Sequence, residues 1–314
     1  MITGACFFNA KEVAERLDYP SLVDALDEGF RSETTVPLRH HHVLPVAGKR
    51  DATMLLMPAW NTNFIGLKTV IVAPENGLKD LPAVQANYQL MDRETGQLLA
   101  YMDGAEITAR RTASASALAS RYLSRPDAHR LAMVGTGVLA PHLIRSHATQ
   151  RTINEVAIWG RDPAKAEALA KKVTSSTCAV RAEANLAYAV GGAEIISCAT
   201  LTTVPLIEGS LLEPGQHLDL VGAFTPEMRE VDDTVVSQAE IYIDTDDAKN
   251  SVGEIKGPLE RGVIKEENIL GTLADLTGGR IKHPRSNPSA VTLFKSAGTA
   301  LEDLTAAVLV YIRA

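Results

Sequence analysis

The chain has 314 residues, a formal net charge of −7, 46% hydrophobic residues and 22% charged ones, a composition typical of a soluble globular protein with one large domain or two ordinary ones. The negative charge argues against binding to nucleic acid or to an anionic membrane, and the lack of a long apolar run or a leader-like N-terminus argues against a membrane span or a signal peptide. Three isolated cysteines, Cys6, Cys178 and Cys198, predict reduced thiols in a cytoplasmic protein rather than disulfides or a zinc site.

The first third of the chain predicts an α+β arrangement. Asn9 with Glu12 three residues later indicates a capped short helix, and a second helix is expected to begin near Ser21. Strands are expected over 54–60, 64–73, 84–91 and 98–102, with Gly96 at a positive-φ position in the turn between the last two. An alanine-rich helix is expected over 106–123.

From His129 onward the pattern alternates between strand and helix. Strands are expected near 130–135, 154–159, 177–181, 194–199, 217–222 and 240–244, a rhythm that predicts a parallel, doubly wound sheet. The segment 276–290 is predicted to be a loop, and a last helix is expected over 289–313. The fold class is therefore α/β, with a Rossmann domain over 116–289 and an α+β domain built from 1–115 and 290–314.

The segment 131–140 contains the strongest motif, an apolar strand followed by G-x-G-x-x-A and a helix. Gly135 allows the tight turn, and Gly137 lets a pyrophosphate approach the backbone because it has no Cβ. The helix that follows offers free N–H groups and the positive end of its dipole. A second strand at the right distance completes the pattern, which predicts a bound dinucleotide.

The end of that second strand bears on which dinucleotide is bound. An NAD site usually has an acidic residue there, whereas an NADP site supplies arginine for the 2′-phosphate. This strand ends in Trp159, Gly160 and Arg161, which favours NADPH, with NADH as a weaker alternative. Asp162 is the competing acid, with Arg161 then a solvated residue, but Pro163 after it makes Asp162 a better helix N-cap.

Three cations in the N-terminal part, Arg39, Lys68 and Arg111, are candidates for binding a small anion such as a carboxylate. Lys68 lies in an apolar strand, where it either reaches out to solvent, the commoner case, or points inward to a counter-ion. No metal site is expected, because consecutive residues in the triplet 40–42, all histidine, point to opposite faces of a strand. A serine-hydrolase motif is absent.

Taken together, these motifs resemble the ornithine cyclodeaminase/mu-crystallin family. The matching segments are 36–39, 57–59, 66–68, 107–113, 135–137, 197–200, 221–223, 229–230, 294–298 and 302–303. The resemblance implies a homodimer in which a Rossmann domain lies between the two halves of a substrate-binding and dimerisation domain. It also implies that Arg39, Lys68, Arg111 and Gly298 bind the substrate, with Lys68 and Arg111 catalytic.

The same resemblance, with the dinucleotide motif, implies a set of cofactor-binding residues. They are Arg111, Thr112, Gly135, Thr136, Gly137, Val138, Leu139, Trp159, Gly160, Arg161, Thr200, Val221, Gly222 and Ala297.

One departure from the family bears on the activity. A cyclodeaminase has an acidic residue shortly after its Val-Gly-Gly segment, whereas this chain has Phe224 there, which cannot transfer a proton. The amino-acid sequence over 135–145 and 221–230 is similar to the corresponding segments of bacterial reductases of cyclic imino acids. The expected reaction is the NADPH-dependent reduction of Δ1-pyrroline-2-carboxylate or Δ1-piperideine-2-carboxylate to L-proline or L-pipecolate, with Lys68 or a water as the proton source. The alternatives are a cyclodeaminase, an alanine dehydrogenase, or a non-enzymatic ligand-binding protein like mu-crystallin.

Overall fold

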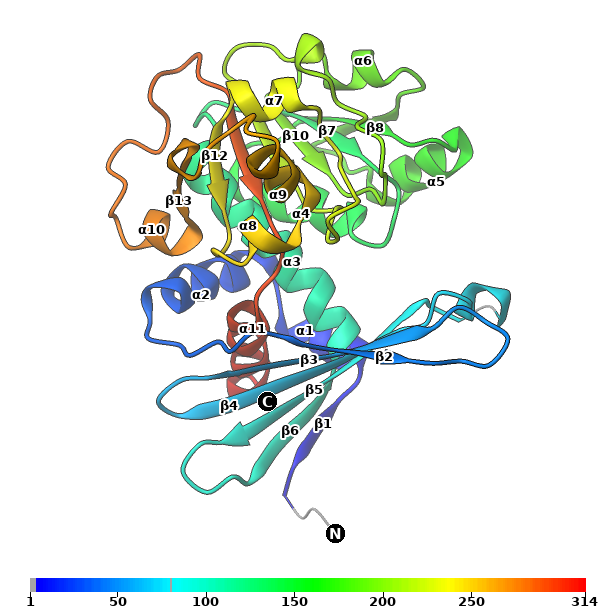
Figure 1. The fold of residues 1–314 in the computed structure, drawn as a ribbon, viewed down its shortest axis with the longest axis vertical. Helices are drawn as coiled ribbons and strands as arrows, with labels where there is room; N and C mark the ends of the chain where they lie inside the picture. The colour runs from blue at the N-terminus through cyan, green and yellow to red at the C-terminus, as the bar shows by residue number, and fades with distance from the viewer. Residues whose placement is uncertain (1–3, 80) are drawn as a thin grey trace. The chain divides into compact units, whose positions relative to one another are not determined.

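The computed structural model describes residues 4–79 and 81–314 (Figure 1). Their contacts divide the chain into two compact units. The first contains the residues up to Arg111 together with Thr299–Ala314, and the second is Thr112–Gly298. The boundary falls inside the long helix α3 (Gly104–Leu123).

The first unit is built on a six-stranded sheet with the order β1-β6-β5-β4-β3-β2. Its strands are β1 (Cys6–Phe8), β2 (His40–Leu44), β3 (Ala52–Trp60), β4 (Phe64–Val72), β5 (Val84–Asp92) and β6 (Leu98–Asp103), and only the β1–β6 pair is parallel. Its helices are α1 (Ala10–Arg16), α2 (Tyr19–Arg31) and α11 (Ala300–Ile312), with a 3-10 turn, η1, at Asn76–Lys79.

Local capping and turn chemistry in this unit follow the prediction. Asn9 and Glu12 form the expected capping box on α1, and Gly96 has a φ of 71° in the hairpin turn. The second helix begins two residues before Ser21, because Asp18 rather than Ser21 is its N-cap and accepts a hydrogen bond from the Ser21 N–H. Strands β1 and β2 were not among the strands expected from the sequence.

The two faces of this sheet differ in what covers them. The helices of the unit lie on one side of it (Figure 1), and α11 contacts β3, β4 and β5. Side chains of a strand alternate between faces, and Lys68 contacts α11, so Leu67 and its same-face neighbours point the other way. The neighbours on β3 and β4 are Met54, Leu56, Pro58, Trp60, Ile65, Thr69 and Ile71, and β5 places Gln85, Asn87 and Gln89 on the same face. This second face is therefore mostly apolar over β3 and β4 and polar over β5.

The second unit contains a parallel sheet of eight strands in the order β13-β12-β14-β11-β10-β7-β8-β9. They are β7 (Arg130–Val134), β8 (Glu155–Trp159), β9 (Ala179–Ala182), β10 (Ile195–Cys198), β11 (His217–Leu220), β12 (Glu240–Ile243), β13 (Ile269–Thr272) and β14 (Thr292–Lys295). The strand order reverses at β7, which confirms the doubly wound α/β fold and places its switch point beside that strand.

Helices and short 3-10 turns connect these strands. They are α4 (Ala140–Gln150), α5 (Pro163–Val173), α6 (Leu186–Val190), η2 (Gly209–Leu211), α7 (Asp233–Gln238), α8 (Ala248–Ser251), α9 (Gly253–Glu260), η3 (Glu266–Asn268) and α10 (Leu273–Thr277).

The prediction of a helix over 289–313 is wrong for the first part of that range. Residues Thr292–Lys295 form β14, which is inserted between β11 and β12 and is fully buried. A short apolar run has no periodicity that separates a buried strand from a helix, and β13 was missed as well. The true last helix, α11, begins only at Ala300.

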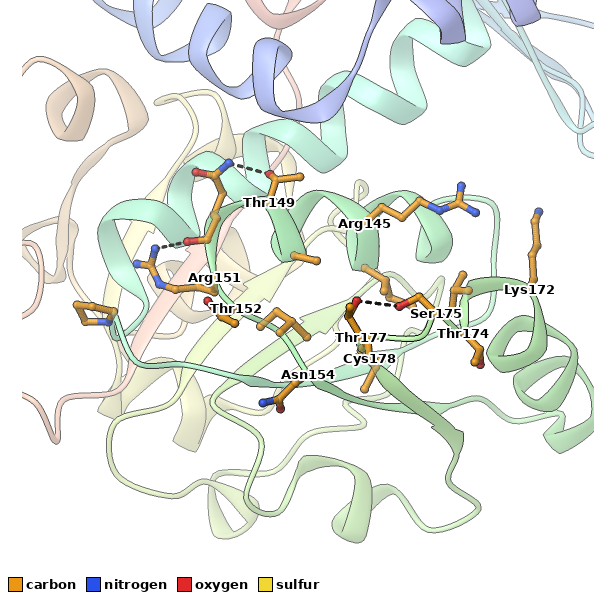
Figure 2. Close-up of a pocket in the computed structure, with 17 residues that line it drawn as sticks. Arg145, Thr149, Arg151, Thr152, Asn154, Lys172, Thr174, Ser175, Thr177 and Cys178 are labelled. Atoms are coloured by element: carbon orange, nitrogen blue, oxygen red, sulfur yellow. Dashed lines mark hydrogen bonds between the residues drawn. The ribbon is translucent and has the colours of Figure 1, made fainter.

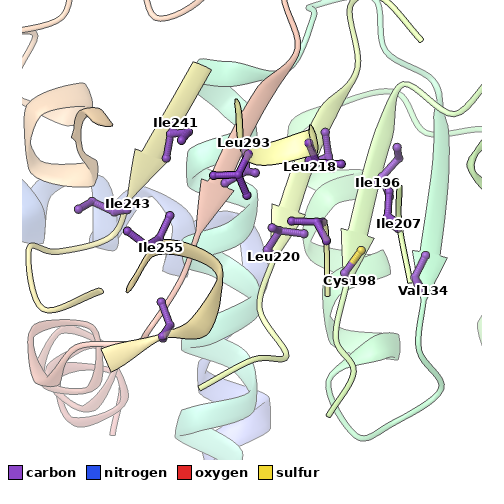
Figure 3. Packing of buried hydrophobic residues seen from close by; sticks show 14 of the residues in the cluster. Val134, Ile196, Cys198, Ile207, Leu218, Leu220, Ile241, Ile243, Ile255 and Leu293 are labelled. Atoms are coloured by element: carbon purple, nitrogen blue, oxygen red, sulfur yellow. The ribbon is translucent and has the colours of Figure 1, made fainter. Parts of the chain in front are cut away.

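One apolar core cluster of the second unit packs on one face of its sheet (Figure 3). Ile196, Leu218 and Leu293 of neighbouring strands pack there with Ile255 of α9. Such a sheet, buried on both faces, is built from nearly continuous apolar strands.

A buried polar network joins α4 to two of these strands. The Asp219 carboxylate of β11 accepts a hydrogen bond from Ser197 Oγ (2.7 Å) and lies 3.0 Å from Nε2 of His147 on α4. Burial alone would raise the pKa of Asp219, but its hydrogen bonds with His147 and Ser197 hold that pKa below its usual value. The network therefore anchors α4, which begins at the glycine turn, to the middle of the sheet.

Candidate active site

The turn after β7 has the backbone geometry that a phosphate-binding loop needs. Gly135 has a φ of 120°, and a Cβ there would lie 2.6 Å from the Ala199 carbonyl oxygen. At Gly137 a Cβ would meet nothing within 4 Å, so the backbone is open at that point. Helix α4 then begins without a side-chain cap on its N-terminus, which suits an anionic group there. These residues fit the pyrophosphate of a dinucleotide.

The end of β8 lies beside this turn. The Gly135 N–H donates to the Trp159 carbonyl oxygen (2.8 Å), and a Cβ on Gly160 would lie 2.7 Å from Cγ2 of Thr136. Asp162 caps α5 by accepting a hydrogen bond from the Ala164 N–H (3.0 Å), as expected. Arg161 is exposed and makes no hydrogen bond or ion pair with any described residue.

The loops after β10 and β11 are joined by a carboxylate, Glu230, that had no assigned role in the sequence analysis. Glu230 accepts hydrogen bonds from the Thr200 N–H (2.7 Å), the Thr200 hydroxyl (2.9 Å) and the Gly222 N–H (2.8 Å). Asp244, at the end of β12, accepts hydrogen bonds from the N–H groups of Ala297 and Gly298, both at 2.6 Å. The only sequence signal for Glu230 was its place in a family-matching pair.

The predicted cofactor residues of the second unit thus follow adjacent strands. They lie after β7, β8, β10, β11 and β14, at the carboxyl ends where doubly wound sheets bind ligands. Thr112 and Arg111 lie on α3, on either side of the division between the units. Val138 is 78% exposed at the glycine turn.

In the first unit, Lys68 and Arg111 meet two carboxylates at the start of α11. Lys68 Nζ lies 2.7 Å from Asp303 Oδ2 and 3.3 Å from the Thr108 hydroxyl. Arg111 binds Asp303 Oδ1 through Nε (2.9 Å) and Glu302 Oε2 through NH1 (2.6 Å). Asp303 therefore bridges the two cations.

The expectation that Lys68 reaches out to solvent is wrong. Its side chain is 1% exposed and points inward to a counter-ion. Burial lowers the pKa of Lys68 to about 8, while the charge of Asp303 opposes that shift. The pKa of Asp303 lies below its usual value, because Lys68 and Arg111 outweigh the effect of its burial. Neither acidic residue of this cluster had been assigned a role from the sequence.

Tyr88 packs against this cluster from β5. It lies opposite Lys68 in the strand register, and a Cβ on Gly66 would overlap its ring and hydroxyl. Its hydroxyl is buried, and burial together with the charge of Asp303 raises the pKa of Tyr88 well above its usual value. A neutral phenol and a charged ammonium therefore face the same carboxylate.

The remaining candidates lie elsewhere in the two units. Arg39 is half-buried just before β2. His40 and His42 lie on one face of β2 with ring centroids 6.3 Å apart, and no group of three or more metal-binding side chains is found among the described residues. Phe224 is 53% exposed in the loop after β11.

A separate pocket of about 790 Å³ lies at the amino ends of β8 and β9, away from the carboxyl ends that carry the predicted cofactor residues (Figure 2). Its walls include the segments that precede β8 and β9, with Arg145, Asn154, Lys172 and Thr177 among the lining residues. None of the predicted cofactor or substrate residues lines it.

Comparison with known proteins places the chain in a family. Residues 5–314 match the ornithine cyclodeaminase/mu-crystallin family. The chain belongs to this family. The resemblance seen in the motifs is thus confirmed.

Three relatives are similar over nearly the whole chain. Protein SAR DEFICIENT 4 of Arabidopsis thaliana is 40% identical, covering 89% of the chain and 87% of the relative. A Δ1-pyrroline-2-carboxylate reductase of Colwellia psychrerythraea is 34% identical, covering 95% and 96% respectively. The ketimine reductase mu-crystallin of Rattus norvegicus is also 34% identical, covering 99% and 98%.

Solved structures of the family superpose on the chain. The Δ1-pyrroline-2-carboxylate reductase of Thermococcus litoralis, in complex with NADH and L-proline, has a TM-score of 0.92 at 28% identity, covering 98% of the chain and 97% of that structure. An archaeal alanine dehydrogenase dimer with bound NAD has a TM-score of 0.90 at 25% identity, covering 98% and 95%. Among the described helices of this chain, none is long and apolar enough to cross a membrane.

Proposed function

We propose that the protein reduces a cyclic imino acid with NAD(P)H, forming L-proline from Δ1-pyrroline-2-carboxylate or L-pipecolate from its six-membered homologue. The observation that carries this proposal is the Lys68 ammonium, buried against Asp303 with a pKa of about 8. Such a group can donate a proton near neutral pH. The likeness to reductases of Δ1-pyrroline-2-carboxylate supports the same conclusion.

The proposed mechanism assigns cofactor binding to residues of the second unit and substrate binding to residues of the first. When bound, the nicotinamide supplies the hydride that is added to C2 of the imine. The turn at Gly135 and Gly137 would hold the pyrophosphate. Arg39, Lys68 and Arg111 hold the substrate carboxylate, and Lys68 gives its proton to the ring nitrogen. Asp303 keeps Lys68 charged and oriented, so most of the rate comes from positioning and electrostatic complementarity.

The reaction itself is the first prediction. With Phe224 where a cyclodeaminase has an acid, we expect negligible ammonia release from L-ornithine with NAD and rapid NADPH oxidation with either cyclic imine. General acid–base help, which Phe224 cannot give, is typically worth about a hundred- to ten-thousand-fold. Pyruvate plus ammonia serves as the comparison substrate for an alanine dehydrogenase. Ornithine converted to proline without net use of cofactor would overturn the proposal, and no turnover of any substrate would favour a binding protein.

The second prediction concerns the proton donor. Activity should fall as the pH rises through the pKa of Lys68, because only the ammonium form donates. Asp303→Asn removes the nearest anion while Arg111 remains, so the pKa of Lys68 should fall and the alkaline limb of the kcat/KM profile should move to lower pH. Glu302→Gln is the matched control, since Glu302 binds Arg111, and it should move the limb less. Identical alkaline limbs in wild type and Asp303→Asn would exclude Lys68 as the donor.

The third prediction concerns the cofactor. We propose a preference for NADPH, because Arg161 is exposed beside the dinucleotide turn and is available for a 2′-phosphate. Arg161→Ala should raise KM for NADPH about ten- to a hundred-fold, the worth of a charge-assisted contact, and leave KM for NADH nearly unchanged. Lys171→Ala, at the far end of α5, should leave both unchanged. A wild-type enzyme that prefers NADH would contradict this assignment.

The fourth prediction concerns assembly. We propose a homodimer formed by the mostly apolar β3–β4 part of the sheet face that lies opposite α11. Phe7 and Tyr101 form a second apolar contact on the same face, on β1 and β6, with ring centroids 6.1 Å apart, and exposed apolar patches of this kind favour association. Leu67→Lys should yield a monomer in light scattering after size-exclusion chromatography, whereas Tyr188→Lys, on an exposed site of α6, should not. A Leu67→Lys protein with wild-type mass would place the interface elsewhere.

A further inference from the structure

Glu230 occupies an unusual position for a buried acid. Its side chain is 1% exposed, yet both of its carboxylate oxygens accept hydrogen bonds from loops at the carboxyl edge of the sheet. Oε1 takes the N–H and the hydroxyl of Thr200, and Oε2 takes the N–H of Gly222. One side chain therefore connects the loop after β10 with the loop after β11.

The two loops touch directly at this point. A Cβ added to Gly222 would overlap both the N and the O of Thr200 and lie 2.6 Å from Glu230 Oε1. Without Glu230, three donors from the two loops would face each other with no common acceptor. Because unpaired buried donors are costly, the loops would have to separate or rotate to reach water.

We propose that Glu230 is a positioning residue that holds the Thr200 and Gly222 loops in the arrangement that binds the nicotinamide cofactor. This inference rests on the proposed function only in taking NAD(P)H as the ligand. Glu230 itself need not touch the cofactor, because it acts through the two backbones that it bonds. An acceptor in this place shapes the site before any ligand arrives.

The charges around Glu230 make its hydrogen bonds to the two loops sensitive to pH. Glu254 of α9 accepts a hydrogen bond from the Glu230 N–H, and Lys295 Nζ of β14 lies 3.5 Å from Glu254 Oε2. Cys198 is a further titratable neighbour, and its own pKa is raised by burial and by the charges of Glu230, Asp219 and Glu254. Burial raises the pKa of Glu230 to about 7, Lys295 opposes that shift, and Glu254 adds to it.

Protonation would convert one accepting oxygen of Glu230 into a donor that faces other donors. The cofactor-binding form is therefore the ionised one. Affinity for the cofactor should weaken as the pH falls through about 7, and it should be fully developed on the alkaline side.

The test compares Glu230→Gln with wild type and with the control Asp233→Asn. Gln keeps the size of the side chain but places an amide NH2 against a backbone or hydroxyl donor. Asp233 lies three residues along and pairs with Arg229 and Arg261 near the surface. NADPH and NADH binding is titrated by nucleotide fluorescence from about pH 6 to about pH 9, and KM for the imine is measured at saturating cofactor.

We expect Glu230→Gln to raise Kd for both nucleotides about ten-fold or more, with KM for the imine changed much less. Wild-type affinity should decline below about pH 7, and the variant should lack that decline. Asp233→Asn should behave as wild type. An unchanged Kd, or the same pH dependence in wild type and variant, would overturn the inference.

Two further results keep this inference separate from the proposed function. If Glu230→Gln does not fold, Thr200→Val removes the hydroxyl bond to Glu230 and should raise Kd by a smaller factor while weakening the decline of affinity below about pH 7. An unchanged Kd there would also overturn the inference. A wild type that binds NADPH, with the predicted loss in Glu230→Gln, but reduces no cyclic imine would refute the proposed substrate and leave Glu230 as a positioning residue.

Discussion

The first unit depends on the contact that Asp303 makes with two cations at once. Lys68 comes from the middle of the sheet and Arg111 from α3, and neither is stable inside a protein without a counter-ion. The start of α11 supplies Asp303 to both and Glu302 to Arg111. Breaking a buried pair of this kind by removing one partner typically costs about 3–5 kcal/mol. The last helix, α11, therefore supplies the counter-ion for Lys68 of β4, a strand in the first quarter of the chain.

The second unit uses buried carboxylates in a similar way, but to hold backbone rather than cations. Glu230 joins the loops after β10 and β11, Asp244 fixes the turn at Ala297 and Gly298, and Asp219 ties α4 to the sheet. Each accepts several donors that would otherwise be buried without a partner. Loops usually carry function because they vary and move, and these acids restrain them at the edge where a dinucleotide is proposed to bind.

Predictions from the sequence succeeded where the cause is local. Asn9 and Glu12 form a capping box on α1, Asp162 and Pro163 start α5, and Gly135 provides the positive φ of the turn after β7. They failed where the cause lies far away in the chain. Nothing beside Lys68 reveals Asp303, nothing beside Glu230 reveals Thr200, and β14 is a strand only because β11 and β12 flank it.

The protonation states in the Lys68 cluster bear on which reaction it suits. Tyr88 keeps its proton, since its pKa is raised well above the usual value, and Asp303 stays ionised, since its pKa is lowered. Lys68, with a pKa of about 8, is the member that exchanges a proton near neutral pH. A deamination requires protons to be taken and returned at both nitrogen and carbon, whereas reduction of a preformed imine requires one proton at nitrogen. A cluster with one exchangeable proton suits the reduction, and so does a chain that has Phe224 where a cyclodeaminase has an acidic residue.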